Sequence, residues 1–313
     1  MRVFVAGGTG VIGRPLLGVL TRAGHQVITM TRSTERIAEL AAMGVEGTVC
    51  DAFDADRVRD TVVRVKPDVV INQLTSIPKR IRPRRIATDF ALNDRLRVEG
   101  TANLVRAAVA AGARRLISQS IAFVYAPKDG DGLCVEDDPL FLNAPEPFAR
   151  GARAVEALER ATLHSEDLEG IVLRYGFFYG PGSVYARGGS MADDIMARRI
   201  PILGGGTGQY SFIHIHDAVE VAAAFVARGA PGTYNVVDDE PTRVRDWLPA
   251  LAVTLGAKPP RHIPSWIGRL AAGPYVVHLM TQLRGASNRK LREELHWTPK
   301  LPRFRDGIHE ALG

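Results

Sequence analysis

Short apolar runs alternate along the chain with segments in which apolar residues recur every three or four positions. Residues 2–6 form the first apolar run and predict a buried strand, and residues 15–20 then predict a helix. Strands that alternate with helices are typical of a parallel sheet covered on both faces. We therefore predict an α/β protein with a Rossmann-type doubly wound parallel sheet. Further strands are predicted at residues 26–30, 47–51, 68–73 and 116–120, and a further helix at residues 99–108.

A glycine-rich loop joins the first predicted strand to the first predicted helix. Glycines at this kind of turn let the backbone approach a pyrophosphate closely. The helix that follows directs unpaired N–H groups and the positive end of its dipole at the phosphates. The loop predicts a dinucleotide site, in which the contacts come from Gly7, Gly10, Val11, Ile12 and Gly13.

The end of the second predicted strand indicates which dinucleotide binds. NAD-specific folds usually have an acidic residue here, which accepts hydrogen bonds from the ribose hydroxyls. This chain instead has Thr31, Arg32 and Ser33. A guanidinium group can pair with a 2′-phosphate, whereas a carboxylate would repel it. The sequence thus favours NADP(H) over NAD(H); the alternative is that Arg32 is an ordinary solvated loop cation.

The ends of the other predicted strands supply further cofactor contacts. In open sheets of this type, ligands bind beyond the carboxyl ends of the strands. An acidic residue after the third strand suits the adenine side of the site, and the residues after the fourth strand would flank the cofactor. The predicted contacts are Asp51, Ala52, Gln73, Leu74, Thr75 and Ser118.

Composition and charge fit an ordinary globular enzyme. The chain has 313 residues, of which 46% are hydrophobic and 24% charged, and its net charge is +6. No apolar run is long enough to span a membrane, and the two cysteines, Cys50 and Cys134, suit a reducing cytoplasm. We expect a cytoplasmic protein with a small-molecule substrate, no nucleic-acid partner and no membrane partner. The sequence leaves open whether the protein forms a homodimer.

Part of the positive charge lies in one basic segment. No aromatic residues are interleaved with its cations, so a solvated loop is the first interpretation and a phosphate or carboxylate contact the second. The segment contains Lys79, Arg80, Arg82, Arg84 and Arg85.

Several segments, taken in order, resemble one family over nearly the whole chain. Besides the glycine loop they are residues 99–104, 118–125, 173–182, 212–217, 234–238 and 287–299. Together they are similar to the extended short-chain dehydrogenase/reductase family, which contains nucleotide-sugar epimerases, dehydratases and related reductases. The resemblance implies a Rossmann fold and a nicotinamide cofactor.

The resemblance also implies two lobes. Residues 1–175 would form the dinucleotide-binding domain, to which residues 212–237 return. Residues 176–211 and 238–313 would form a smaller substrate-binding lobe.

The chain departs from the family at the catalytic residues. None of its seven tyrosines has a lysine four residues later. Phe148 and Ala152 stand where the family has its catalytic tyrosine and lysine, and Ile121 stands at the usual serine or threonine. In the family the lysine hydrogen-bonds the nicotinamide ribose and lowers the pKa of the tyrosine, so that the phenol can exchange a proton.

Reduction could still proceed with another proton donor, because the hydride chemistry belongs to the cofactor. Ser120 and Tyr125 follow the fifth strand, where the nicotinamide should lie. Tyr125 is the first candidate acid, Ser120 could orient a carbonyl or hydroxyl group, and His214 could face the substrate or be a satisfied core histidine. The histidines and cysteines show no metal-ligand spacing, so no metal is expected.

We therefore predict an NADP(H)-dependent oxidoreductase of extended short-chain dehydrogenase type. It would act on a carbonyl or hydroxyl group of a small molecule with a non-standard proton donor. One alternative is a redox-neutral epimerase or dehydratase of the same fold. The other is a non-catalytic NADP(H)-binding sensor.

Overall fold

A seven-stranded parallel sheet forms the centre of the computed structural model, which describes residues 1–78, 80–127, 130 and 132–310. Every strand pair in this sheet is parallel, which confirms the predicted doubly wound sheet. Its order is β11 (Gly232–Val236), β6 (Glu169–Tyr175), β5 (Arg115–Ile121), β4 (Val69–Asn72), β1 (Arg2–Ala6), β2 (Gln26–Thr31) and β3 (Glu46–Val49).

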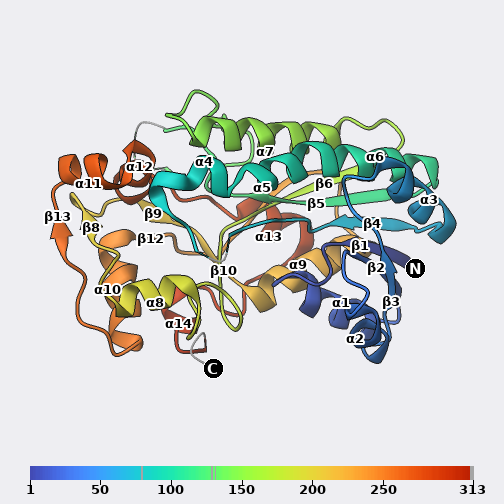
Figure 1. Ribbon diagram of the computed structural model, residues 1–313, viewed down its shortest axis with the longest axis horizontal. Helices are drawn as coiled ribbons and strands as arrows, with labels where there is room; N and C mark the ends of the chain where they lie inside the picture. The colour runs from blue at the N-terminus through green and yellow to red at the C-terminus, as the bar shows by residue number, and fades with distance from the viewer. Residues whose placement is uncertain (79, 128–129, 131, 311–313) are drawn as a thin grey trace.

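Helices cover both faces of the sheet, as Figure 1 shows. Successive strand residues point to opposite faces: Val3 and Val5 lie in one buried cluster, Phe4 and Ala6 in the other. This alternation explains the uniformly apolar strands, since both sides are packed. One face carries α1 (Gly13–Arg22), α2 (Arg36–Ala42) and α9 (Ile215–Ala227). The other carries α3 (Ala55–Val65), α5 (Ala91–Arg95), η2 (Leu96–Gly100), α6 (Thr101–Ala110) and α7 (Phe148–Leu163).

A second lobe lies beside the carboxyl edge of the sheet, at the left in Figure 1. Its apolar core includes Phe212, Trp247 and Phe304, whose rings pack together. Its strands are β7 (Phe177–Tyr179), β8 (Ile202–Leu203), β9 (Gln209–Tyr210), β10 (Phe212–His214), β12 (Thr242–Arg243) and β13 (His262–Ile263). Its helices are α8 (Ser190–Met196), α10 (Val244–Thr254), α11 (Ser265–Ala272), α12 (Pro274–Thr281) and α14 (Phe304–Gly307).

The chain crosses between the two parts of the molecule more than once. Helix α9 packs on α1, and α13 (Arg289–Leu295) packs on β11. The exact division into two domains stays a prediction.

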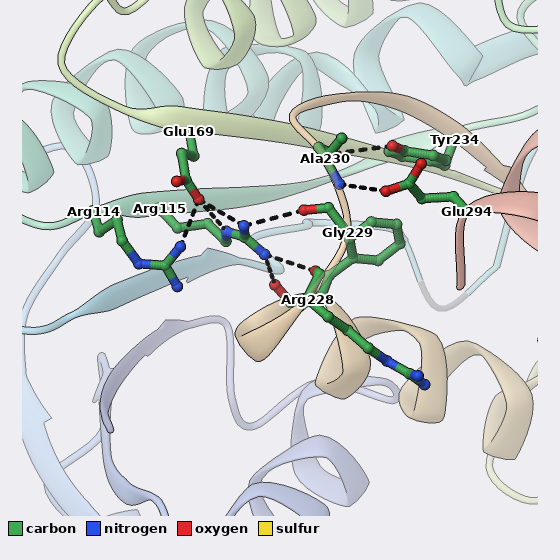
Figure 2. A network of polar contacts seen from close by, with 9 residues as sticks. Arg114, Arg115, Glu169, Arg228, Gly229, Ala230, Tyr234 and Glu294 are labelled. Atoms are coloured by element: carbon green, nitrogen blue, oxygen red, sulfur yellow. Dashed lines mark hydrogen bonds and ion pairs between the residues drawn. The ribbon is translucent and has the colours of Figure 1, made fainter. Parts of the chain in front are cut away.

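Arg115, at the start of β5, closes the end of α9 (Figure 2). Its guanidinium group donates to the carbonyl oxygens of Phe225, Arg228 and Gly229 at 2.6, 2.7 and 3.1 Å. The carboxylate of Glu169 accepts from the same group at 2.6 Å. Arg115 thus satisfies carbonyls that a helix end leaves unpaired and anchors α9 against the sheet.

The basic segment after β4 is more than a solvated loop. Arg80 pairs with Asp194 of α8 at 2.5 Å, and the guanidinium group of Arg84 donates to the carbonyl oxygen of Ala271 at 3.2 Å. The segment therefore contacts the second lobe. One of these contacts is with a carboxylate, which was the second interpretation of its positive charge. Lys79 lies outside the described residues. Short helices here are η1 (Pro83–Arg85) and α4 (Ile86–Asp89).

None of the helices in the described part of the chain is both long and apolar enough to cross a membrane.

Candidate functional site

The glycine loop between β1 and α1 has no room for a Cβ atom at three of its positions. On Gly8 it would lie 2.3 Å from the hydroxyl oxygen of Thr29. A Cβ atom on Gly7, whose φ is +89°, would lie 2.4 Å from the carbonyl oxygen of Gln73. A Cβ atom on Gly13 would lie 2.1 Å from the carbonyl oxygen of Gly7. Gly10 is different, because its Cβ would meet only that Gly7 oxygen, at 3.3 Å. Gly7 and Gly13 shape the turn, whereas Gly10 leaves space beside it.

The start of α1 presents unpaired donors. Among the described residues, no protein group accepts from the backbone N–H groups of Val11, Ile12 and Gly13, and the helix ladder begins with Arg14, whose N–H donates to Gly10. The first turn contains no acidic residue and the N-cap side chain makes no hydrogen bond. This loop and helix end fit the pyrophosphate of a dinucleotide.

Gln73 and Tyr175 place further unpaired polar atoms near the loop. The Gln73 side chain is 4% exposed, and within the described structure neither its amide nor the Tyr175 hydroxyl makes a hydrogen bond of normal geometry. The hydroxyl faces the amide, and burial raises its pKa. Buried polar groups without a partner of normal geometry are rare in proteins and call for an explanation. This observation also fits a bound cofactor.

The end of β2 carries two cations. Thr31 is buried and its hydroxyl oxygen accepts from the N–H of Ser33 at 3.2 Å. Arg32 is exposed, and in the described part of the chain it has no hydrogen-bond partner. Arg36 lies four positions later and donates to the carbonyl oxygen of Thr9 in the glycine loop at 3.4 Å. Our sequence analysis missed Arg36, although its spacing from Arg32 could have signalled a second cation.

The predicted contacts after β3 and β4 gather near η2. The carbonyl oxygen of Ala52 accepts from the Asn103 side chain at 2.8 Å. A Cβ on Gly100 would lie 3.7 Å from Ala52 and 3.6 Å from Leu74. Asp51 and Thr75 are exposed. Their contact with a cofactor stays a prediction.

Ser118 and Ser120 belong to β5, and their side chains face α7, away from solvent. The Ser118 hydroxyl oxygen accepts from Thr162 at 2.9 Å, and the Ser120 hydroxyl donates to Glu159 at 2.6 Å. Both serines are at most 1% exposed. They connect β5 to α7, and their geometry gives no support to a cofactor or substrate contact.

Tyr125 belongs to the same buried network. Its hydroxyl donates to Asn235 at 2.6 Å and accepts from Arg174 at 2.9 Å. Arg174 in turn forms a buried ion pair with Glu159, in which the closest atoms are 2.6 Å apart. Burial raises the pKa of Tyr125, so the phenol holds its proton. Because its hydroxyl is already committed to protein partners, the geometry does not support Tyr125 as the acid.

His214 caps α9 rather than facing an open site. Its Nδ1 accepts from the N–H of His216 at 3.2 Å, its ring is 6% exposed, and burial lowers its pKa. Its Nε2 has no hydrogen-bond partner among the described residues and lies 3.9 Å from a carboxylate oxygen of Glu310, so a role of His214 toward a substrate stays a prediction.

Two aromatic rings cover the place where the resemblance puts the catalytic pair. Phe148 begins α7, is 8% exposed, and stacks on Tyr275 of α12 with ring centroids 4.6 Å apart. Ala152, one turn further along α7, is fully buried. The second lobe therefore closes an apolar surface over this position, and the aromatic partner could not be predicted from local spacing.

One cluster has the composition of a metal site. His216, Asp217 and Glu220 bring their ligand atoms within 4.8 Å of one another. The ammonium group of Lys300 already lies 2.7 Å from Glu220, and both oxygens of Asp217 accept backbone N–H groups. The cluster is therefore an interaction between α9 and the C-terminal segment.

Known proteins resemble this chain in sequence and in fold. A 3-diazoavenalumate denitrifying reductase from a Streptomyces species is 46% identical over 98% of this chain and 99% of its own length. The UDP-glucose 4-epimerase of Thermotoga maritima with UDP-glucose has a TM-score of 0.78 at 19% identity, covering 99% of this chain and 97% of that one. The UDP-glucose 4-epimerase of Thermus thermophilus in complex with NAD has a TM-score of 0.76 at 22% identity, with coverage of 99% and 97%.

The family match covers the whole Rossmann region. The NAD dependent epimerase/dehydratase family model matches residues 3–236, which include the glycine loop and all seven strands of the main sheet. The matching relatives include proteins named as reductases and one named as an epimerase. The chain belongs to the NAD-dependent epimerase/dehydratase family of enzymes.

Proposed function

We propose that this protein is a nicotinamide-dependent reductase that replaces the diazo group of a small carboxylate substrate with hydrogen. One structural observation carries the proposal: Phe148 and Ala152 leave the usual catalytic position without a proton donor or a charge. The 46% identical relative is named for reductive denitrification of a diazo carboxylate, which supplies the substrate class.

The two kinds of reduction differ in their need for an acid. Reduction of a carbonyl group requires a hydride and a proton, because the substrate oxygen takes up negative charge. A diazonium group is cationic, so one hydride neutralises it: R–N₂⁺ and H⁻ give R–H and dinitrogen. A C–H bond replaces the C–N bond, and no proton is consumed. A bound nicotinamide cofactor supplies the hydride.

The residues around this position suit such a reaction. Phe148 and Tyr275 form an apolar stack, and Ala152 beside Phe148 on α7 is fully buried, so this position is shielded from bulk water. Exclusion of water protects reactive groups from hydrolysis. The chain's own contribution would then be to bind and orient the substrate.

The cofactor preference is a further part of the proposal. Arg32 directly follows β2, where NAD-specific folds have an acid, and Arg36 begins α2 and contacts the glycine loop, so NADP(H) is the proposed cofactor. A cytoplasmic location and a homodimer remain predictions.

The test uses the purified protein, NADPH and para-carboxybenzenediazonium labelled at both nitrogens. We expect loss of NADPH, labelled dinitrogen and benzoate in equal amounts, with deuterium from deuterated NADPH in the benzoate. Reactions without protein and with the Gly10→Val variant measure background reduction. Turnover of a carbonyl panel without release of dinitrogen would overturn the proposal in favour of carbonyl reduction. Tightly retained cofactor without net turnover would favour a redox-neutral enzyme, and binding alone a sensor.

A further inference from the structure

Arg97 is a mostly buried cation whose nearest carboxylate is shared with a second arginine. It lies in η2, a π-helical turn, and its side chain is 14% exposed. Its nearest acidic atom, on Asp94, is 3.9 Å away. The other oxygen of Asp94 pairs with Arg150 at 3.1 Å, so two arginines share one carboxylate. Burial lowers the pKa of Arg97, yet a guanidinium group stays charged at neutral pH. A net positive charge therefore remains here.

Asn93 adds a second unsatisfied donor beside Arg97. Its side chain is 1% exposed, and its Oδ1 accepts from the N–H of Ser76 at 3.0 Å, which fixes the orientation of the amide. The amide nitrogen has no partner among the described residues. Asn93 precedes Arg97 by four positions, a spacing that brings two side chains to one helix face. Two donor groups are thus left for an acceptor that the protein does not supply.

These donors lie next to the proposed reaction site. The Asp94 Oδ1 atom, which lies 3.9 Å from Arg97, would also lie 3.7 Å from a Cβ atom on Gly151, the residue before Ala152 in α7. Glu159 is committed to Arg174 and does not neutralise Arg97. The end of η2 at Gly100 packs near Leu74, which follows β4. The unpaired donors therefore lie beside the first turns of α7, which also carry Phe148 and Ala152. Within helices, π-turns of this kind are frequent at functional sites.

We propose that Arg97 and Asn93 bind the carboxylate of an aromatic substrate whose ring packs on the surface formed by Phe148 and Tyr275. The guanidinium group offers two parallel N–H donors, which match the two oxygens of a carboxylate. The side chains of Phe148 and Tyr275 explain why the substrate would be aromatic, because aromatic rings pack favourably against one another. The inference rests on the proposed function and names the substrate class of that same site.

The test is a calorimetric titration of the protein loaded with NADP⁺, using cinnamate and the uncharged cinnamamide. We expect the unmodified protein to bind cinnamate about 10-fold more tightly or better, as a charged hydrogen bond would give. Arg97→Gln should abolish this preference, and Arg97→Lys should retain part of it. Asn93→Asp keeps the acceptor for Ser76 but adds a negative charge, so it should weaken cinnamate binding. Arg160→Gln, on the exposed side of α7, is the matched control and should change nothing.

Equal affinity for the two compounds in the unmodified protein, or no binding of cinnamate, would overturn the inference even if every variant failed to fold. A second experiment distinguishes failure of the carboxylate site from failure of the proposed reductase function. It compares the release of dinitrogen from labelled benzenediazonium and from its para-carboxylated form. Release of dinitrogen from both at equal kcat/KM would leave the reductase standing and remove the carboxylate site. Preference for cinnamate without release of dinitrogen would leave the carboxylate site standing and remove the reductase.

Discussion

The rings of Phe148 and Tyr275 stack with their centroids 4.6 Å apart and their planes 16° from parallel. Phe148 begins α7 on the sheet, whereas Tyr275 belongs to α12 of the second lobe (Figure 1). The stack joins the two parts of the molecule over the position that carries a catalytic tyrosine in the resembled family. An aromatic contact thus replaces an acid there.

The stack should contribute packing and not proton transfer. Tyr275→Phe keeps the ring and should leave turnover of a diazonium substrate within about threefold of the unmodified enzyme. Tyr275→Ala removes the ring and should raise KM about 10-fold or more, since an aromatic contact contributes on the order of 1 kcal/mol beyond its buried area. Steady-state kinetics of the two variants decide this. A loss of two decades in kcat for Tyr275→Phe would instead identify the phenol as an acid.

We expect Tyr125 to stabilise the folded protein and to have no part in proton transfer. Tyr125→Phe removes the hydrogen-bond donor to the Asn235 Oδ1 atom and one acceptor of Arg174, and should lower the free energy of unfolding by about 1–3 kcal/mol. Turnover should stay within about threefold, because no free donor is lost from the reaction site. Urea unfolding and kinetics on the same preparation test both statements. A general acid would show the reverse pattern, with a fall of about 100-fold in turnover and little change in stability.

Arg32 and Arg36 should together set the cofactor preference. Replacing either by Asp should weaken NADPH binding by about 10–100-fold, since a charged hydrogen bond contributes about 1.5–3 kcal/mol. NADH binding should change much less. Fluorescence titration of both nucleotides measures this, with Arg22→Asp, at the other end of α1, as the control. Equal affinities of the unmodified protein for the two nucleotides would remove the NADP assignment.

The glycines of the loop should fall into two classes. In Gly10→Val the new Cβ atom would contact only the Gly7 oxygen, so the protein should still fold. Its side chain should block the position of the cofactor phosphates. Gly13→Ala places a methyl group against that oxygen, where a Cβ would lie 2.1 Å away, and should destabilise the protein itself. Thermal unfolding with and without NADPH distinguishes them. Stabilisation of folded Gly10→Val by NADPH would mean that this glycine does not face the cofactor.

Asp238 should make stability depend on pH. Its side chain is 1% exposed; burial raises its pKa well above the usual value, and the charges of Asp239 and Glu240 raise it further. The folded protein therefore keeps a proton that the unfolded chain releases above about pH 4. The stabilising contribution is fully present below that pH and is lost as the pH rises.

Asp238→Asn removes this titration, so its stability relative to the unmodified protein should increase between about pH 5 and pH 8. Thermal melts across this range measure the difference. Asp167→Asn is the control, because Asp167 is exposed and is not among the charges that act on Asp238. If the difference in stability between Asp238→Asn and the unmodified protein did not change with pH, the Asp238 carboxyl would have the same pKa in the folded and unfolded states.

The sequence by itself determined the architecture and the cofactor loop. The strands from β1 to β5 and the turn through Gly7 and Gly13 could be predicted because each depends on local periodicity or on the conformation of a few adjacent residues. The missing Tyr-x-x-x-Lys pair needed no structure either, because its spacing lies within one helix. The seven-stranded parallel sheet confirms this part of the analysis.

Only the tertiary structure decided which polar side chains have partners. Tyr125 and Ser120 follow or end β5 as expected, yet their hydroxyl groups bind Asn235 and Glu159, which are 110 and 39 residues away. The local sequence around Arg97 does not predict its incomplete pairing, because that depends on Asp94 also pairing with Arg150 of α7. Hydrogen-bond satisfaction depends on contacts between distant segments, and no local pattern of hydrophobic and polar residues encodes it.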